Sequence, residues 1–180
     1  MKEAEFKRQN SLFSLCGLNC GLCSMKLGGY CPGCGQGNKP CKAARCSLEH
    51  DVEYCFQCNE YPCPIYDHAD ESDSFITHRN QMTDSLKAKQ IGIEAYNLEQ
   101  TEKVKLLNEL LSKYNSGREK TLYCLAVNLF EVDEIKSLLK NVSEYTDSSE
   151  ITLKEKALYV SNLMRQLAQK KNVELKLRKR

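Results

Sequence analysis

Ten of the eleven cysteines lie between residues 16 and 63, and this cluster is the part of the chain whose residue types and spacing could do chemistry. Three pairs are separated by two residues, a spacing that lets one tight turn present two thiolates to the same metal ion. The sequence therefore predicts a metal-binding segment. The predicted ligands are Cys16, Cys20, Cys23, Cys31, Cys34, Cys41, Cys46, Cys55, Cys58 and Cys63.

A disulfide framework is the alternative explanation for dense cysteine, and it is typical of small secreted domains. Residues 1–9 are mostly charged or polar, whereas a secretory signal has a positive start followed by an apolar run. No segment approaches the roughly 18 apolar residues of a membrane span. We therefore predict a cytosolic protein with no membrane partner, in which the clustered cysteines stay reduced and bind metal.

The ordered cysteine spacings resemble those of a prokaryotic family called domain of unknown function 3795. The segments that carry the resemblance are Cys16-Gly-Leu-Asn-Cys20-Gly-Leu-Cys23, Cys31-Pro-Gly-Cys34, Cys41, Cys46 and Glu53-Tyr-Cys55-Phe-Gln-Cys58-Asn-Glu-Tyr-Pro62-Cys63. They cover about a third of the chain. The resemblance implies a small zinc-binding module of the bacterial and archaeal cytosol, with no established reaction.

Ligand counting limits the number of sites. Four-coordinate zinc takes four ligands, so ten cysteines can form two all-cysteine zinc sites with two thiols left over, or three sites if His50 and another group join them; two sites are the prediction. The spacing alone leaves open which cysteines share an ion. It also leaves open an iron–sulfur cluster, because four thiolates suit iron–sulfur centres as well as zinc. We expect ordinary surface or packing roles, not ligation, for His50, His68 and His78.

A three-cysteine motif, Cys16-x3-Cys20-x2-Cys23, matches the signature of radical enzymes that use S-adenosylmethionine. Those enzymes carry it on a large α/β barrel of about 200 or more residues, and the alternating strands and helices of such a barrel are missing here. The sequence offers no other catalytic constellation. Cys124, the one cysteine outside the cluster, is predicted to be a buried small hydrophobe instead of a nucleophile.

The charge balance bears on the kind of partner. The net charge is only +2, and the acidic and basic side chains between residues 16 and 63 cancel. Each Zn²⁺ with four thiolates adds two negative charges, which disfavours binding of phosphates by this segment. We therefore predict a protein partner and not a nucleic acid. The basic tail, Lys170 to Arg180, is expected either to dock on the protein's own acidic module or to contact an anionic partner.

Glycine and proline interrupt the cysteine segment, whereas apolar residues recur with helical spacing further on. The expected helices are 75–89, capped by Asp73 or Ser74, then 102–114, 122–130, 132–142 and one that Thr152 and Glu155 begin as a capping box. Residues Val173 to Leu177 alternate as in a strand, and we expect them to pair with a short strand of the metal module.

The predicted fold class is α+β, mostly α, with a small cysteine-rich module of turns and short strands packed on a helical bundle. The expected boundaries are a flexible N-terminus (1–11), the metal-binding module (12–66), a connection (67–74) and a helical domain with a short C-terminal strand and basic tail (75–180). The predicted function is that of a zinc-binding interaction module with structural metal. The alternatives are an iron–sulfur or thiol redox protein and a metal-dependent enzyme with an open coordination position.

Overall fold

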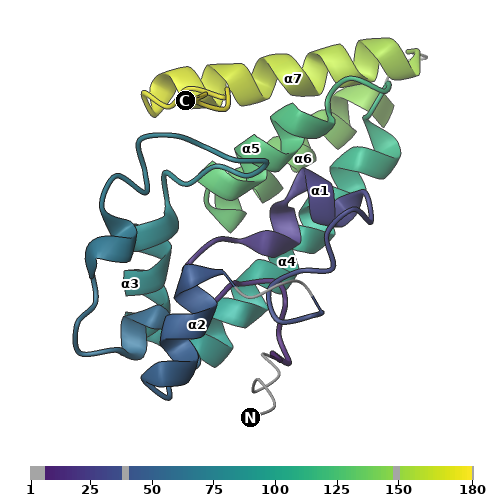
Figure 1. Ribbon diagram of the computed structural model, residues 1–180. Coiled ribbons are helices and arrows are strands. Elements are labelled where there is room, and N and C mark those ends of the chain that lie inside the picture. Colours follow the sequence, from purple (N-terminus) through teal and green to yellow (C-terminus); the bar gives the residue numbers. More distant parts are fainter. Residues whose placement is uncertain (1–6, 38–40, 148–150, 180) are drawn as a thin grey trace. The chain divides into compact units, whose positions relative to one another are not determined.

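The computed structural model describes residues 7–37, 41–147 and 151–179. The chain forms short helices in its first third and longer helices afterwards (Figure 1). In chain order the helices are η1 (Cys20–Leu22), α1 (Ser24–Leu27), α2 (Lys42–Glu49), η2 (Cys55–Gln57), η3 (Pro64–Tyr66), α3 (Gln81–Ile91), α4 (Ile93–Lys113), α5 (Lys120–Leu129), α6 (Val132–Asp147) and α7 (Leu153–Lys170), where η denotes a 3₁₀-helix.

The predicted α+β fold class is wrong, because the protein is helical and the described residues contain no strand. Their one β-bridge is an isolated antiparallel contact between Lys7 and Gln36. Residues 173–177 do not join a sheet. Their alternating pattern is short, and the described part of the glycine-rich cysteine segment forms turns and short helices that offer no partner strand.

The chain divides into two compact units, and the division falls within α4. The N-terminal unit comprises Met1–Thr101 and Leu177–Arg180, and the helical unit comprises Glu102–Lys176. The cysteine segment therefore shares its unit with α3, with the start of α4 and with the end of the chain. Residues 1–6 of the expected flexible terminus lie outside the described residues.

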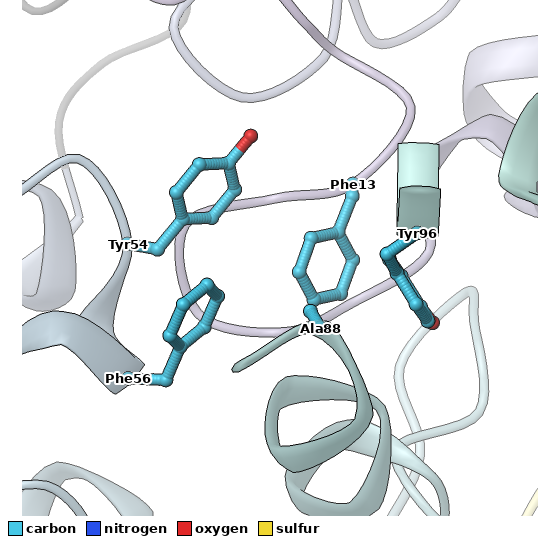
Figure 2. Packing of buried hydrophobic residues seen from close by; sticks show 5 residues of the cluster. All are labelled: Phe13, Tyr54, Phe56, Ala88 and Tyr96. Carbon is cyan, nitrogen blue, oxygen red and sulfur yellow. The ribbon is translucent and has the colours of Figure 1, made fainter. Parts of the chain in front are cut away.

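An aromatic cluster forms the best-defined core of the N-terminal unit. Phe13, Tyr54, Phe56, Ala88 and Tyr96 are all buried in it. Figure 2 shows the ring of Phe13 between those of Tyr54 and Tyr96, at centroid distances of 5.8 and 4.6 Å. Each such ring buries a large apolar area. The cluster therefore joins the segment before the first cysteine to the segment around Cys55 and to helices α3 and α4.

The helical unit confirms three expectations from the sequence. Its last helix, α7, begins at the predicted capping box, in which the Glu155 N–H donates to Thr152 Oγ1 and the Glu155 carboxylate accepts from the Thr152 N–H at 2.7 Å. Helices also form over 122–130 and 132–142, as α5 and α6. Cys124 is buried, with 7% of its surface exposed. Within this unit α7 packs against α5 and α6.

Two helix boundaries of the N-terminal unit differ from the expected ones. The helix predicted from residue 75 begins at Gln81, because the carboxylate of Asp73 accepts from the N–H of His78 at 2.8 Å and from Thr77 Oγ1 at 3.2 Å. These bonds hold residues 73–78 in a loop. The helix predicted from residue 102 begins earlier, at Ile93, directly after Gly92.

The C-terminal tail is fixed to this same loop through Arg178. Asp73 donates its backbone N–H to the Arg178 carbonyl at 2.8 Å. In return, Arg178 donates its backbone N–H to Asp73 Oδ2 at 2.8 Å and its Nη2 to Oδ1 at 3.1 Å. The tail thus docks on its own chain, at the predicted connection between the cysteine segment and the helices.

Gly17, the residue after the first cysteine, is held where no side chain fits. Its φ is +92°, and an added Cβ would clash with the backbone oxygen of Gln81 and with Ser85 Oγ on α3. Gly17→Ala is therefore expected to lower the free energy of unfolding by roughly 2 kcal/mol or more. Gly29 is the matched control, since its φ is also positive but an added Cβ meets no described atom within 4 Å. Equal losses for Gly17→Ala and Gly29→Ala in denaturant titrations would contradict close packing at Gly17.

Candidate metal centre

Four cysteines line one small cavity in the N-terminal unit. They are Cys46, Cys55, Cys58 and Cys63, hereafter the cavity cysteines. The cavity has a volume of about 20 Å³, which is close to the space that one water molecule or one ion requires. The structure thus brings together the last four of the ten predicted ligands, with His50, Glu60 and Tyr61 among the other lining residues.

The cavity cysteines lie at the ends of three short helices. Cys46 lies on the last turn of α2, Cys55 and Cys58 stand at the two ends of η2, and Cys63 caps the N-terminus of η3. The neighbours of Cys55 fix its direction. Tyr54 and Phe56 are buried in the aromatic cluster (Figure 2), whereas Cys55 between them lines the cavity.

The other six predicted ligands are hereafter called the N-terminal cysteines, and they are not separate from the cavity cysteines, because Cys16, Cys34 and Cys55 all pack against the buried residues Leu15, Ala43 and Ala44. Among the N-terminal cysteines, the thiols of Cys16, Cys20 and Cys34 lie close enough to influence each other's ionisation. Cys41 interacts in the same way with Cys16 and Cys34, whereas Cys23 approaches Cys20 and Cys31 approaches Cys34. The N-terminal cysteines are Cys16, Cys20, Cys23, Cys31, Cys34 and Cys41.

Side chains far away in the sequence hold the loop at Cys16. The Cys16 carbonyl accepts hydrogen bonds from Gln81 Nε2 at 2.8 Å and from the buried hydroxyl of Tyr66 at 3.2 Å. Ser14 Oγ lies 3.3 Å from Cys16 Sγ and accepts from the Leu18 N–H at 2.9 Å. Helices α3 and η3 therefore fix the entrance to the cysteine segment, and nothing in the cysteine spacing indicated this.

Burial makes the thiols of Cys20 and Cys55 poor nucleophiles. It raises the pKa of Cys20 to about 12, with further increases from the neighbouring thiols of Cys16, Cys34 and Cys23. It also raises the pKa of Cys55 to about 11, although a hydrogen bond from Tyr66 acts in the opposite direction. Reactive cysteines have a lowered pKa, so these environments favour a structural role over thiol redox or nucleophilic catalysis.

All eleven cysteines lie in described residues and are free thiols. In the described part of the chain, no three His, Cys, Asp or Glu side chains already have the arrangement of a metal site. The cavity cysteines line the same cavity, but their side chains do not have the arrangement of a metal site. As a donor set they fit a thiophilic ion, because four thiolates suit zinc or an iron–sulfur cluster.

The histidines differ in their surroundings. His50 lines the cavity, at the end of α2. His68 Nδ1 lies 2.5 Å from the Glu71 carboxylate, and this hydrogen bond raises the pKa of the exposed imidazole. His78 contacts Ser74 Oγ at 3.0 Å and the Ala69 carbonyl at 3.1 Å through its two ring nitrogens. His68 and His78 thus have local partners in the loop after the cysteine segment.

Sequence reasoning missed Arg8, which lies beside both cysteine groups. Its side chain is 1% exposed, and its Cζ lies 4.2 Å from the centroid of the Tyr54 ring. Its backbone N–H donates to the Gly35 carbonyl at 3.2 Å. In the sequence, Arg8 is one of several charged residues between residues 1 and 11, so no local pattern could have identified it as a buried side chain.

Comparison with known proteins adds no relative. No family model, no curated protein and no solved structure matches this chain. In the described residues, no helix has the length and apolar character needed to cross a bilayer. The functional conclusion therefore depends on the cysteine segment itself.

Proposed function

We propose that this chain is a cytosolic zinc-binding protein in which the metal is structural. The observation that carries the proposal is the cavity lined by Cys46, Cys55, Cys58 and Cys63. Four thiolates at about 2.3 Å would complete a tetrahedral zinc site and leave no position for a reactive water. The cavity cysteines would hold the ion, and binding would draw their sulfur atoms inward. The proposal includes a relationship to the family called domain of unknown function 3795, whose cysteine spacings this chain resembles.

A protein whose metal is structural is expected to act by binding a partner and not by catalysis. The raised pKa values of the buried thiols disfavour nucleophilic chemistry, and a closed site disfavours metal-dependent hydrolysis. Ile65 on η3, which lines the cavity, is 38% exposed, and Leu48 on α2, which follows the lining residue Ser47 in the chain, is 44% exposed. We propose that a metal-stabilised surface that includes them contacts a protein partner, and that nucleic acid is not the partner.

Metal analysis of Cys58→Ser tests the proposal. The wild-type protein, purified anaerobically, is expected to be colourless and to hold about two zinc ions per chain. Cys58→Ser is expected to lose about one, because a hydroxyl is a poor ligand at a soft site. Cys124→Ser, on α5, is the control and should retain the wild-type zinc content.

Two outcomes would contradict this proposal. A brown protein with iron and an absorbance band at about 400 nm would favour an iron–sulfur centre. An unchanged zinc content in Cys58→Ser would show that the cavity cysteines are not ligands.

A further inference from the structure

The helical unit has a groove of its own between α6 and α7, and no cysteine takes part in it. The groove has a volume of about 410 Å³, which is within the range of binding sites in proteins. Leucines form its apolar floor, and polar or charged side chains form its rims. The lining includes Asp133, Leu138 and Asn141 on α6 and Leu163, Leu167 and Lys170 on α7.

Two tyrosines extend the groove at one end. Tyr145 follows Asn141 by one helical turn on α6, and Tyr159 precedes Leu163 by one turn on α7, so both belong to the stripes that line the groove. Their rings stack at a centroid distance of 4.1 Å, and Tyr145 is 43% exposed. The groove and the two tyrosines, hereafter the α6/α7 face, extend over about 18 Å of α6.

Opposite charges flank the other end of the α6/α7 face. The beginning of α6 meets the end of α7 there, because Lys171 Nζ donates to Glu134 Oε1 at 2.7 Å. The neighbours of this pair, Asp133 and Lys170, therefore lie at the same height on opposite rims. Both are exposed, and among the described residues neither side chain has a hydrogen-bond or ion-pair partner.

This pattern of charges is complementary to itself. A two-fold axis parallel to the helices would place α6 of each copy over α7 of the other, at the same height along the axis. Asp133 of one copy would then face Lys170 of the second copy on both rims. The leucines would meet leucines and the tyrosines would meet tyrosines. Each helix would have antiparallel neighbours, which is the arrangement of a four-helix bundle.

We propose that the α6/α7 face is a homodimer interface, with a second copy of this chain as its occupant. The apolar floor supplies the attraction, and the two Asp133–Lys170 pairs fix the orientation of the copies. A face about 18 Å long and two helices wide is at the low end of specific interfaces, so we expect dissociation in the micromolar range. This inference goes beyond the proposed function, because the face contains no metal ligand.

The oligomeric state of the full-length protein tests the proposal. Sedimentation analysis between about 1 and 200 μM should show a monomer–dimer equilibrium. Asp133→Lys and Lys170→Asp each place like charges against one another on both rims, so each should weaken the dimer at least about tenfold. Lys154→Asp is the matched control. It makes the same change of charge at an exposed position in the first turn of α7 that does not line the groove, and the dimer should persist.

Mixing the two charge-reversed variants tests the pairing between copies. One copy of each variant forms two pairs of opposite charge, so an equimolar mixture should regain the wild-type affinity within about threefold. Each variant alone should remain largely monomeric at the same concentration. An attraction between Asp133 and Lys170 within one chain would not be restored by mixing, so this result separates the two arrangements.

Three outcomes would overturn the proposal. They are a wild-type protein that stays monomeric at about 200 μM, a dimer that both charge reversals leave intact, and a mixture that stays monomeric. Circular dichroism checks that each variant is folded. Should a reversal prevent folding, Asp133→Asn and Lys170→Gln decide, since loss of one charge must weaken the dimer and reduce its sensitivity to salt. Zinc content is measured on the same samples, and its absence would contradict the proposed function without altering the result for the dimer.

Discussion

Chelation of the metal under reducing conditions is expected to disorder the cysteine segment while α5, α6 and α7 keep their helices. The segment has only short helices and a small aromatic core, so little burial opposes its conformational entropy. A structural zinc site supplies roughly 10–16 kcal/mol, which is comparable to the entire stability of an ordinary domain. Loss of the metal should therefore unfold the segment that it holds.

Hydrogen exchange measures this effect residue by residue. Amides between residues 16 and 63 should lose protection on chelation, and α3 should lose part of its protection because Gln81 bonds to the Cys16 loop. The far-ultraviolet circular dichroism should fall only modestly. Zinc added back to the reduced protein is the control and should restore protection. A metal-free, reduced protein that keeps full protection between residues 16 and 63 would show that the metal is not structural.

Asp73→Ala is expected to cost roughly 3 kcal/mol and to release the C-terminal tail. The side chain of Asp73 is fully buried, and it accepts bonds from Arg178, His78 and Thr77. Its removal leaves the N–H groups of Arg178 and His78 without their acceptor and Arg178 without its main ion pair. Proteolysis should then remove the tail more rapidly. Asp70→Ala, at an exposed acid in the same loop, should stay within about 0.5 kcal/mol of the wild type.

The Asp73 carboxylate also makes the stability of the protein depend on pH. Burial raises the pKa of Asp73, but the hydrogen bonds from Arg178 and from the His78 N–H outweigh this and lower it from 3.8 to about 2. Because the pKa of Asp73 is lowered in the folded protein, its ionised carboxylate stabilises the folded state by roughly 2 kcal/mol at pH values above about 4. This contribution is lost as the pH falls from about 4 to 2. Denaturant titrations across that range should show this loss in the wild type and not in Asp73→Asn. Parallel curves for the two proteins would contradict the assignment.

Features that depend on nearby residues could be predicted from the sequence. Helical spacing of apolar residues located α5 and α6, and the Thr152 and Glu155 pair located the start of α7, because both signals act within one or two helical turns. The cysteine cluster is also a local feature, and its two-residue spacings predict turns that could present thiolates to a metal ion. The predicted sheet failed, because a strand needs a distant partner that no local pattern specifies.

Which cysteines line one cavity, and which side chains support them, became visible only in the folded structure. The cavity cysteines come from three short helices, and the loop at Cys16 depends on Gln81, 65 residues further on. Arg8 reaches Glu53 across 45 residues, and Asp73 reaches Arg178 across 105. Such contacts follow from how the whole unit buries its apolar and charged groups. The spacing of the cysteines therefore supplied the candidate ligands, and the fold supplied the cavity that four of them line.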